Sequence, residues 1–149
     1  DVVSEDETET GVRAILNFGH TLGHAIEAAT HYKELRHGEA VAIGMVAAAR
    51  LSLKLGLCNK DVCRRIERLI ANVGLPIKLS DVEIFKNLQP DKEVLRPAFS
   101  LQPLFKTMEM DKKVAGGKIK FVMVEDIGKV IFKEIESMDF PIDLAGILN

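Results

Sequence analysis

The chain has 149 residues, of which 20 are Lys or Arg and 22 are Asp or Glu, so its net charge is −2; 47% of its residues are hydrophobic. This length fits one domain with a substantial core, and the high apolar content with a low net charge excludes a disordered chain. The balanced charge gives no basic footprint for nucleic acid, and no apolar run is long enough to cross a membrane. We therefore expect a globular domain that binds neither nucleic acid nor membranes.

The chain contains two cysteines, Cys58 and Cys63, which are too few for a disulfide framework and lack the CxxC spacing. Reduced cysteines of this kind are typical of cytoplasmic proteins, and we expect that location. The first residues are Asp1-Val2-Val3, with neither an initial Met nor a signal-peptide pattern. This beginning indicates a piece of a longer protein.

The N-terminal half carries three helical patterns. An acidic segment over 4–10 comes first and is expected to face water. Apolar residues then recur at steps of three and four from Val12 to Ala29, which predicts one continuous helix. A broader apolar pattern predicts a largely buried helix from Gly38 to Leu55, ended by a glycine. Asn59 is expected to cap a third helix, from Lys60 to Val73.

The C-terminal half changes from helical to strand-like periodicity after the glycine pair at 116–117. The expected elements are helices over 80–88, 101–112 and 139–149, and a hairpin of strands 118–124 and 130–132 around a loop at 125–129. The predicted fold class is therefore mainly α and multi-helical, with one small β-hairpin.

All four histidines fall between positions 20 and 37. His20 and His24 are four residues apart, which places both imidazoles on one face of a helix, a spacing that helical metal sites use. His37 opens the next helix, and a short connection would bring it beside the other two. The alternative is that these histidines are hydrogen-bonded structural residues, and the spacing alone does not decide. His31 lies between the helices and is expected at the surface.

Two further features surround the histidine pair. Gly19 and Gly23 each precede a histidine, and glycine costs a helix roughly 1 kcal/mol relative to alanine; the pair therefore indicates close approach of a ligand or of another backbone. Arg13 and Asn17 continue the same helical face. They predict a polar ridge that either grips an anionic substrate or faces solvent.

The segments RAILNFGHTLGHAIE (13–27) and HGEAVAIGM (37–45), with MDKK (110–113) further on, closely resemble the 3-dehydroquinate synthase family. In that family an α/β NAD-binding domain precedes a mainly helical domain that supplies most metal and substrate contacts. The resemblance implies that residues 1–149 form this C-terminal domain and that the NAD-binding domain is absent from the chain. The chain indeed has no glycine-rich nucleotide loop, so no NAD-binding residue is expected in it.

The resemblance also implies an activity. The family converts 3-deoxy-D-arabino-heptulosonate 7-phosphate to 3-dehydroquinate and phosphate in the shikimate route to aromatic amino acids, using Zn²⁺ or Co²⁺ and transient oxidation by NAD. It implies a phosphate-eliminating lyase that acts as a homodimer, of which this fragment alone is inactive. The alternatives are a related sugar-phosphate cyclase, such as a 2-deoxy-scyllo-inosose synthase, and a non-catalytic helical interaction domain.

The histidine spacing alone would pair His20 and His24 on one metal ion. The family resemblance, carried over position by position, implies a different pair. The implied roles are metal binding by His20 and His37, catalysis by His24 and Glu9, and substrate binding by Arg13, Asn17 and either Lys112 or Lys113. A third metal ligand, a glutamate, is implied in the absent NAD-binding domain.

Overall fold

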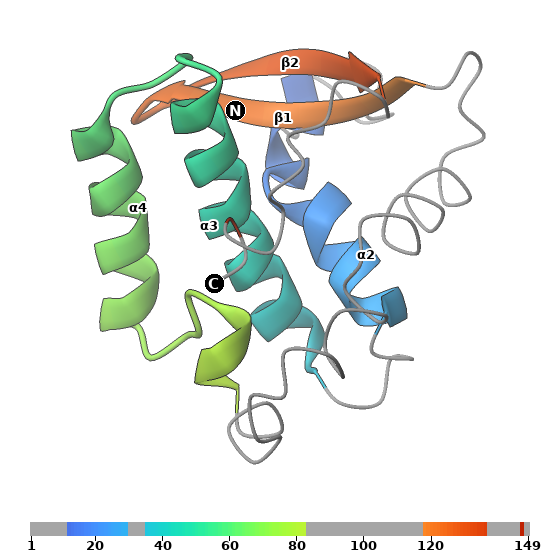
Figure 1. The fold of residues 1–149 in the computed structure, drawn as a ribbon, viewed down its shortest axis with the longest axis vertical. Helices are drawn as coiled ribbons and strands as arrows, with labels where there is room; N and C mark the ends of the chain where they lie inside the picture. The colour runs from blue at the N-terminus through green and yellow to red at the C-terminus, as the bar shows by residue number, and fades with distance from the viewer. Residues whose placement is uncertain (1–11, 30–34, 83–117, 137–146, 148–149) are drawn as a thin grey trace.

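The computed structural model describes residues 12–29, 35–82, 118–136 and 147 (Figure 1). Its elements are η1 (Val12–Asn17), α2 (His20–Ala29), α3 (His37–Lys54), α4 (Lys60–Asn72), η2 (Leu79–Asp81), β1 (Lys118–Asp126) and β2 (Lys129–Glu136). The two strands pair antiparallel as a hairpin across one end of the helices. This arrangement confirms the predicted mainly α fold with one hairpin.

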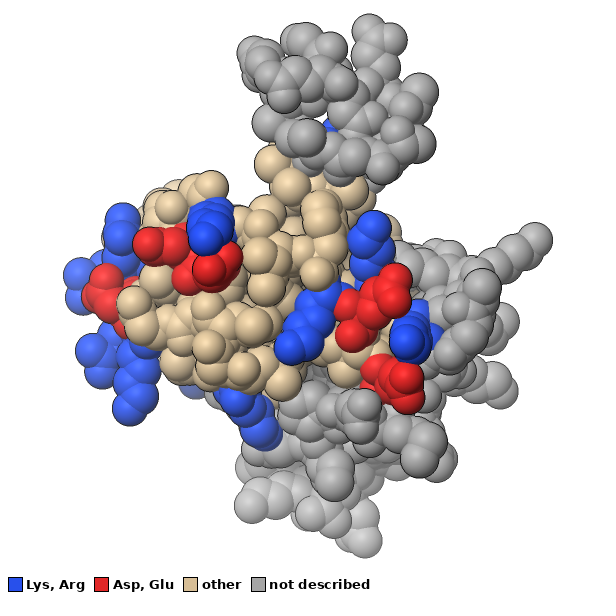
Figure 2. Space-filling view, turned by 90° about the horizontal axis from the view of Figure 1, so that it is seen from above, with Lys and Arg blue, Asp and Glu red and all other residues tan. Residues whose placement is uncertain are grey.

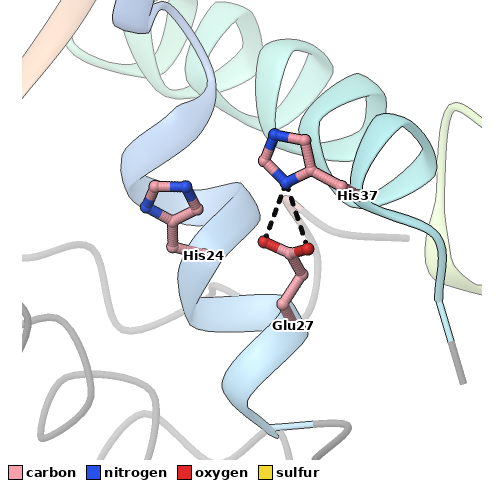
Figure 3. A group of neighbouring side chains, drawn as sticks. All are labelled: His24, Glu27 and His37. Carbon is pink, nitrogen blue, oxygen red and sulfur yellow. Dashed lines mark hydrogen bonds and ion pairs between the residues drawn. The ribbon is translucent and has the colours of Figure 1, made fainter. Parts of the chain in front are cut away.

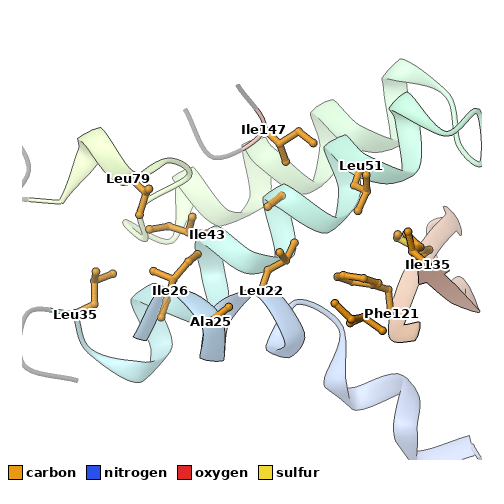
Figure 4. Packing of buried hydrophobic residues seen from close by; sticks show 14 of the residues in the cluster. Leu22, Ala25, Ile26, Leu35, Ile43, Leu51, Leu79, Phe121, Ile135 and Ile147 are labelled. Atoms are coloured by element: carbon orange, nitrogen blue, oxygen red, sulfur yellow. The ribbon is translucent and has the colours of Figure 1, made fainter. Parts of the chain in front are cut away.

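Helix α3 is the centre of the domain, lying between α2 and α4 and contacting β1 (Figure 1). It is apolar around most of its circumference, as a central helix requires, and its buried residues include many alanines that let neighbours approach closely. One apolar cluster, on the side of α2 and the hairpin, includes Leu22, Ile43, Leu51 and Phe121 (Figure 4). A second, which contains Val46, faces α4. Helix α3 therefore joins two cores.

The ends of α3 and α4 follow the predicted signals. Gly56 lies just after α3 with φ +71°, a conformation that glycine adopts without steric cost. The Asn59 side chain accepts a hydrogen bond from the backbone N–H of Val62 at 3.0 Å, which satisfies a free amide at the start of α4. At the start of α3, the Glu39 carboxylate accepts the backbone N–H of Arg36 at 3.0 Å. These local contacts fix the helix boundaries.

The predicted continuous helix over 12–29 is wrong at Gly19. The chain forms a 3₁₀ helix up to Asn17, turns, and begins α2 at His20. Gly19 has φ +83°, and a Cβ added there would lie 2.5 Å from the Met45 Cγ and 2.6 Å from the Met45 backbone nitrogen. The positive φ interrupts the helix, and a residue with a side chain would not fit there against α3, so Arg13 and the histidines do not share one helical face.

The hairpin is longer than predicted, because its turn needs only residues 127–128 rather than a five-residue loop. Gly128 has φ +80°, which suits a tight turn. Over the hairpin, basic and acidic side chains are interspersed (Figure 2), with Lys118 close to Glu136 at 3.7 Å and Lys129 close to Glu125 at 3.0 Å. Exposed pairs of this kind contribute about 0–1 kcal/mol each. Burial of the inner face of β1 therefore holds the hairpin to the helices.

A buried serine completes the contact between α3 and β1. Val124 lies in β1 next to a shift in strand register between Val124 and Asp126, and its backbone N–H bonds to a side chain of α3. That N–H donates to Ser52 Oγ at 3.1 Å, and the Ser52 hydroxyl donates to the Ala48 carbonyl at 2.7 Å. Ser52 is fully buried, so its hydroxyl pairs a backbone amide that water cannot reach.

The remaining predictions fall mostly outside the described residues. The helices expected over 101–112 and 139–149 lie outside them, except for Ile147, which is buried. Most of the helix expected over 80–88 also lies outside them, and its described part belongs to the short η2. Both cysteines are free, and burial raises the pKa of Cys63 to about 11. Among the described helices, none combines the length and the apolar character needed to cross a membrane.

We expect Ser52→Ala to lower the free energy of unfolding by about 1–3 kcal/mol, because it leaves the buried Val124 N–H without a partner. Urea unfolding of the chain, followed by far-UV circular dichroism, measures the difference. Ser80→Ala, at an exposed position, serves as the control and should change the midpoint little. Equal midpoints for the two variants would contradict the role given to Ser52.

Candidate metal centre

Three imidazoles meet where α2 passes the start of α3. His20 and His24 come from α2 and His37 is the first residue of α3. The ring centroids lie 5.6 Å apart for His20 and His24, 5.7 Å for His20 and His37, and 5.8 Å for His24 and His37. The predicted convergence of the three side chains is confirmed.

The convergence depends on an unusually close crossing of α2 and α3. A Cβ added to Gly44 of α3 would clash with the Gly19 carbonyl oxygen and lie 2.8 Å from the Gly23 nitrogen. A Cβ on Gly23 would lie 3.1 Å from the Val41 Cα. Of the two explanations that the sequence left open for these glycines, close approach of another backbone is therefore the one observed. Only glycine fits at Gly44 without moving one helix.

The Glu27 carboxylate, to which the family resemblance gives no role, lies against this cluster. His37 Nδ1 lies 3.1 Å and 3.2 Å from the two carboxylate oxygens of Glu27 (Figure 3). The Glu27 side chain is 10% exposed, whereas that of His37 is 59% exposed. Glu27 follows His24 by three residues and so shares its helical face. That spacing was visible in the sequence, but the contact with His37 depends on how the two helices cross.

The chemistry of these donors fits a divalent transition-metal ion. One ligand atom from each of His24, Glu27 and His37 lies within 4.8 Å of the others, and imidazole and carboxylate are donors that Zn²⁺ and Co²⁺ accept. Within the described part of the chain, His20 Nδ1 is buried and has no hydrogen-bond partner. A buried polar atom in this state costs about 1–3 kcal/mol, so a ligand near His20 would stabilise the site.

Other residues with predicted roles belong to a different element or lie outside the described residues. Arg13 and Asn17 are on η1, which contacts β1, and both are partly buried. His31 lies outside the described residues, and so do Glu9, Lys112 and Lys113, whose roles the family resemblance implies. Cys63 belongs to the apolar cluster between α3 and α4, and Cys58 packs against that cluster.

Comparison with solved structures identifies the class of fold. A 2-deoxy-scyllo-inosose synthase in complex with carbaglucose-6-phosphate, NAD⁺ and Co²⁺ aligns with a TM-score of 0.72 over 99% of this chain and 38% of its own length, at 23% identity. A 2-epi-5-epi-valiolone synthase from Streptomyces hygroscopicus subsp. jinggangensis, with NAD⁺ and Zn²⁺ bound, aligns with a TM-score of 0.68 over 99% of this chain and 35% of its own, at 20% identity. The fold is that of the dehydroquinate synthase-like synthases.

Sequence comparison then identifies the family. A 3-dehydroquinate synthase of Synechococcus sp. is 41% identical over 150 residues, covering 100% of this chain and 36% of that protein. One from Bradyrhizobium diazoefficiens is 47% identical over 137 residues, covering 91% and 34%. The chain belongs to the 3-dehydroquinate synthase C-terminal family, whose model matches residues 1–114. It spans about a third of the length of these relatives.

We expect Gly44→Ala to destabilise the chain by about 1–3 kcal/mol, because the added methyl group overpacks the contact between α2 and α3. Gly38→Ala is the matched control on the same helix, since a Cβ there meets nothing within 4 Å and alanine favours a helix. Thermal unfolding of both variants checks the prediction. A Gly44→Ala variant as stable as Gly38→Ala would show that the helices are not in contact there.

Proposed function

We propose that this chain is the metal- and substrate-binding domain of a 3-dehydroquinate synthase, which converts 3-deoxy-D-arabino-heptulosonate 7-phosphate to 3-dehydroquinate and phosphate. The observation that carries the proposal is the cluster of His20, His24 and His37, with ring centroids 5.6–5.8 Å apart, in a chain of this family. The relatives that share 41–47% of its residues carry the same name. The reaction would eliminate phosphate from a sugar phosphate and close a carbon ring.

In this proposal His20 and His37 hold a Zn²⁺ or Co²⁺ ion, and the third protein ligand comes from an NAD-binding domain elsewhere in the protein. Three protein ligands leave one position open, as catalytic zinc sites require. The ion supplies Lewis-acid polarisation of the hydroxyl group that NAD oxidises. The similar 2-deoxy-scyllo-inosose synthase holds NAD⁺ and Co²⁺, and the similar 2-epi-5-epi-valiolone synthase holds NAD⁺ and Zn²⁺, which supports a divalent metal ion and NAD⁺ as the cofactors.

The chain's own side chains bind the substrate and move protons. Arg13 offers a planar fork that suits a carboxylate or phosphate, and Asn17 can orient a hydroxyl group. His24 lies next to the metal-binding pair, and its imidazole can accept or donate a proton in the reaction. Glu9 and one lysine of the pair 112–113 complete the proposed set.

The rest of the proposal concerns the whole protein. Without an NAD-binding domain, the 149-residue chain lacks the oxidant and one metal ligand, so we expect it to be inactive alone. We propose a homodimer in the cytoplasm, because Cys58 and Cys63 form no disulfide and unpaired cysteines are typical of proteins in a reducing compartment.

A related sugar-phosphate cyclase is the second candidate, and the fold similarity to a 2-deoxy-scyllo-inosose synthase favours it. The two functions differ in substrate, because the heptulosonate phosphate carries a carboxylate as well as a phosphate, whereas a hexose phosphate carries the phosphate alone. Arg13 and the lysine pair at 112–113 favour the substrate that carries a carboxylate.

The function is tested by the complete protein with NAD⁺ and Zn²⁺, followed by phosphate release. We expect turnover of the heptulosonate phosphate and none of hexose 6-phosphate, because Arg13 and the lysine pair would hold a carboxylate that the hexose lacks. The 149-residue chain alone is the control and should release no phosphate. Turnover of the hexose phosphate alone would favour the second candidate, and phosphate release by the isolated chain would overturn the assignment to one domain of a larger enzyme.

The metal assignment predicts different effects for the three histidines. In the complete protein, His20→Ala and His37→Ala should lose bound zinc, because each removes a ligand. His24→Ala should retain zinc and lose kcat by about 10²–10⁴-fold, as expected for loss of a proton-transfer group. Atomic absorption of the purified variants measures the metal. Zinc loss in His24→Ala, with zinc retained in His20→Ala, would instead assign the ion to His24, Glu27 and His37.

A further inference from the structure

We propose that Glu27 is a positioning residue for His37, whose tautomer and ring orientation its carboxylate fixes so that Nε2 is free to bind a metal ion. The two carboxylate oxygens of Glu27 lie 3.1 Å and 3.2 Å from His37 Nδ1. The second ring nitrogen of His37 points away from Glu27 (Figure 3). Neither the family resemblance nor the comparisons give Glu27 a role.

The burial of the two side chains determines which of them directs the other. Glu27 is 90% buried, and its helix packs against α3, so its carboxylate has little freedom to move. His37 is 59% exposed and begins a helix. Without a partner, an exposed imidazole would sample several rotamers and both neutral tautomers. The buried carboxylate therefore orients the exposed ring.

The chemistry of the contact selects one tautomer. A carboxylate only accepts hydrogen bonds, so the nitrogen facing it must carry the proton. With Nδ1 protonated, the lone pair of neutral His37 is on Nε2, the form in which a histidine can bind a metal. Carboxylate–histidine–metal arrangements of this kind raise ligand basicity, and loss of the carboxylate typically weakens metal binding 10–100-fold.

This inference rests on the proposed function in one respect, which is that His37 binds an ion. The tautomer can be tested without an ion. Long-range ¹H–¹⁵N correlation spectra of the metal-free 149-residue chain at mildly alkaline pH report which ring nitrogen of each histidine is protonated. We expect Nδ1–H for His37, a mixture of tautomers in Glu27→Ala, and retention of Nδ1–H in Glu27→Gln, whose amide oxygen still accepts.

The control for this experiment is Glu39→Gln. Glu39 is a second glutamate near His37, two residues after it in α3. Its carboxylate accepts the backbone N–H of Arg36 instead of contacting His37. If Glu39→Gln changed the His37 tautomer as much as Glu27→Ala does, the effect would come from the helix end and the proposal would fail. An Nε2–H tautomer of His37 in the unmodified chain would overturn it directly.

Zinc affinity then tests the consequence. In the complete protein, titration with Zn²⁺ should give a 10–100-fold weaker Kd for Glu27→Ala, a smaller loss for Glu27→Gln, and no change for Glu39→Gln. A loss in Glu27→Gln as complete as in His37→Ala would make Glu27 a direct ligand and overturn the positioning role. The proposed function fails separately if His37→Ala leaves zinc binding unchanged, a result that does not alter the tautomer measurement.

Discussion

The contact between the backbones of α2 and α3 is the constraint on which the rest of this structure depends. At Gly19, Gly23 and Gly44 the backbones of the two segments approach so closely that a single added Cβ would meet main-chain atoms of the other segment. The N-terminal helical segment is interrupted at Gly19, and the close crossing places the α2 histidines beside the first residue of α3. Packing and chemistry thus have the same origin, because the glycines that allow the helices to touch also bring together the nitrogen donors.

The sequence predicted those elements whose signals are local. Helices α3 and α4 were found within a residue or two of their ends, because apolar periodicity, Asn59 and Gly56 act within one turn of the chain. The continuous helix over 12–29 failed for a different reason. Periodicity records which side chains are apolar, whereas the positive φ of Gly19 and its close contact with Met45 of α3 are properties of the folded backbone.

The candidate site was predictable to a similar extent. The four-residue spacing of His20 and His24 indicates a shared face, and the short connection to His37 indicates convergence, which the ring distances confirm. The spacing alone favours pairing the two α2 histidines on one ion, whereas the family resemblance assigns the ion to His20 and His37, and this assignment stays a prediction. Glu27 was visible as an acid on the same face, but its partner became apparent only from the crossing of the two helices.

Helix α3 also divides the interior. Leu22, Ile43 and Leu51 lie in the core shared with α2 and the hairpin, whereas Val46 and Cys63 lie in the core shared with α4. Phe18 and Met45 pack against the second core as well, and Met45 lies against Gly19, the residue before His20. The core beside α4 is therefore connected to the segment that carries the α2 histidines, and a substitution that loosens α4 can reach the imidazoles through Met45 and Gly19.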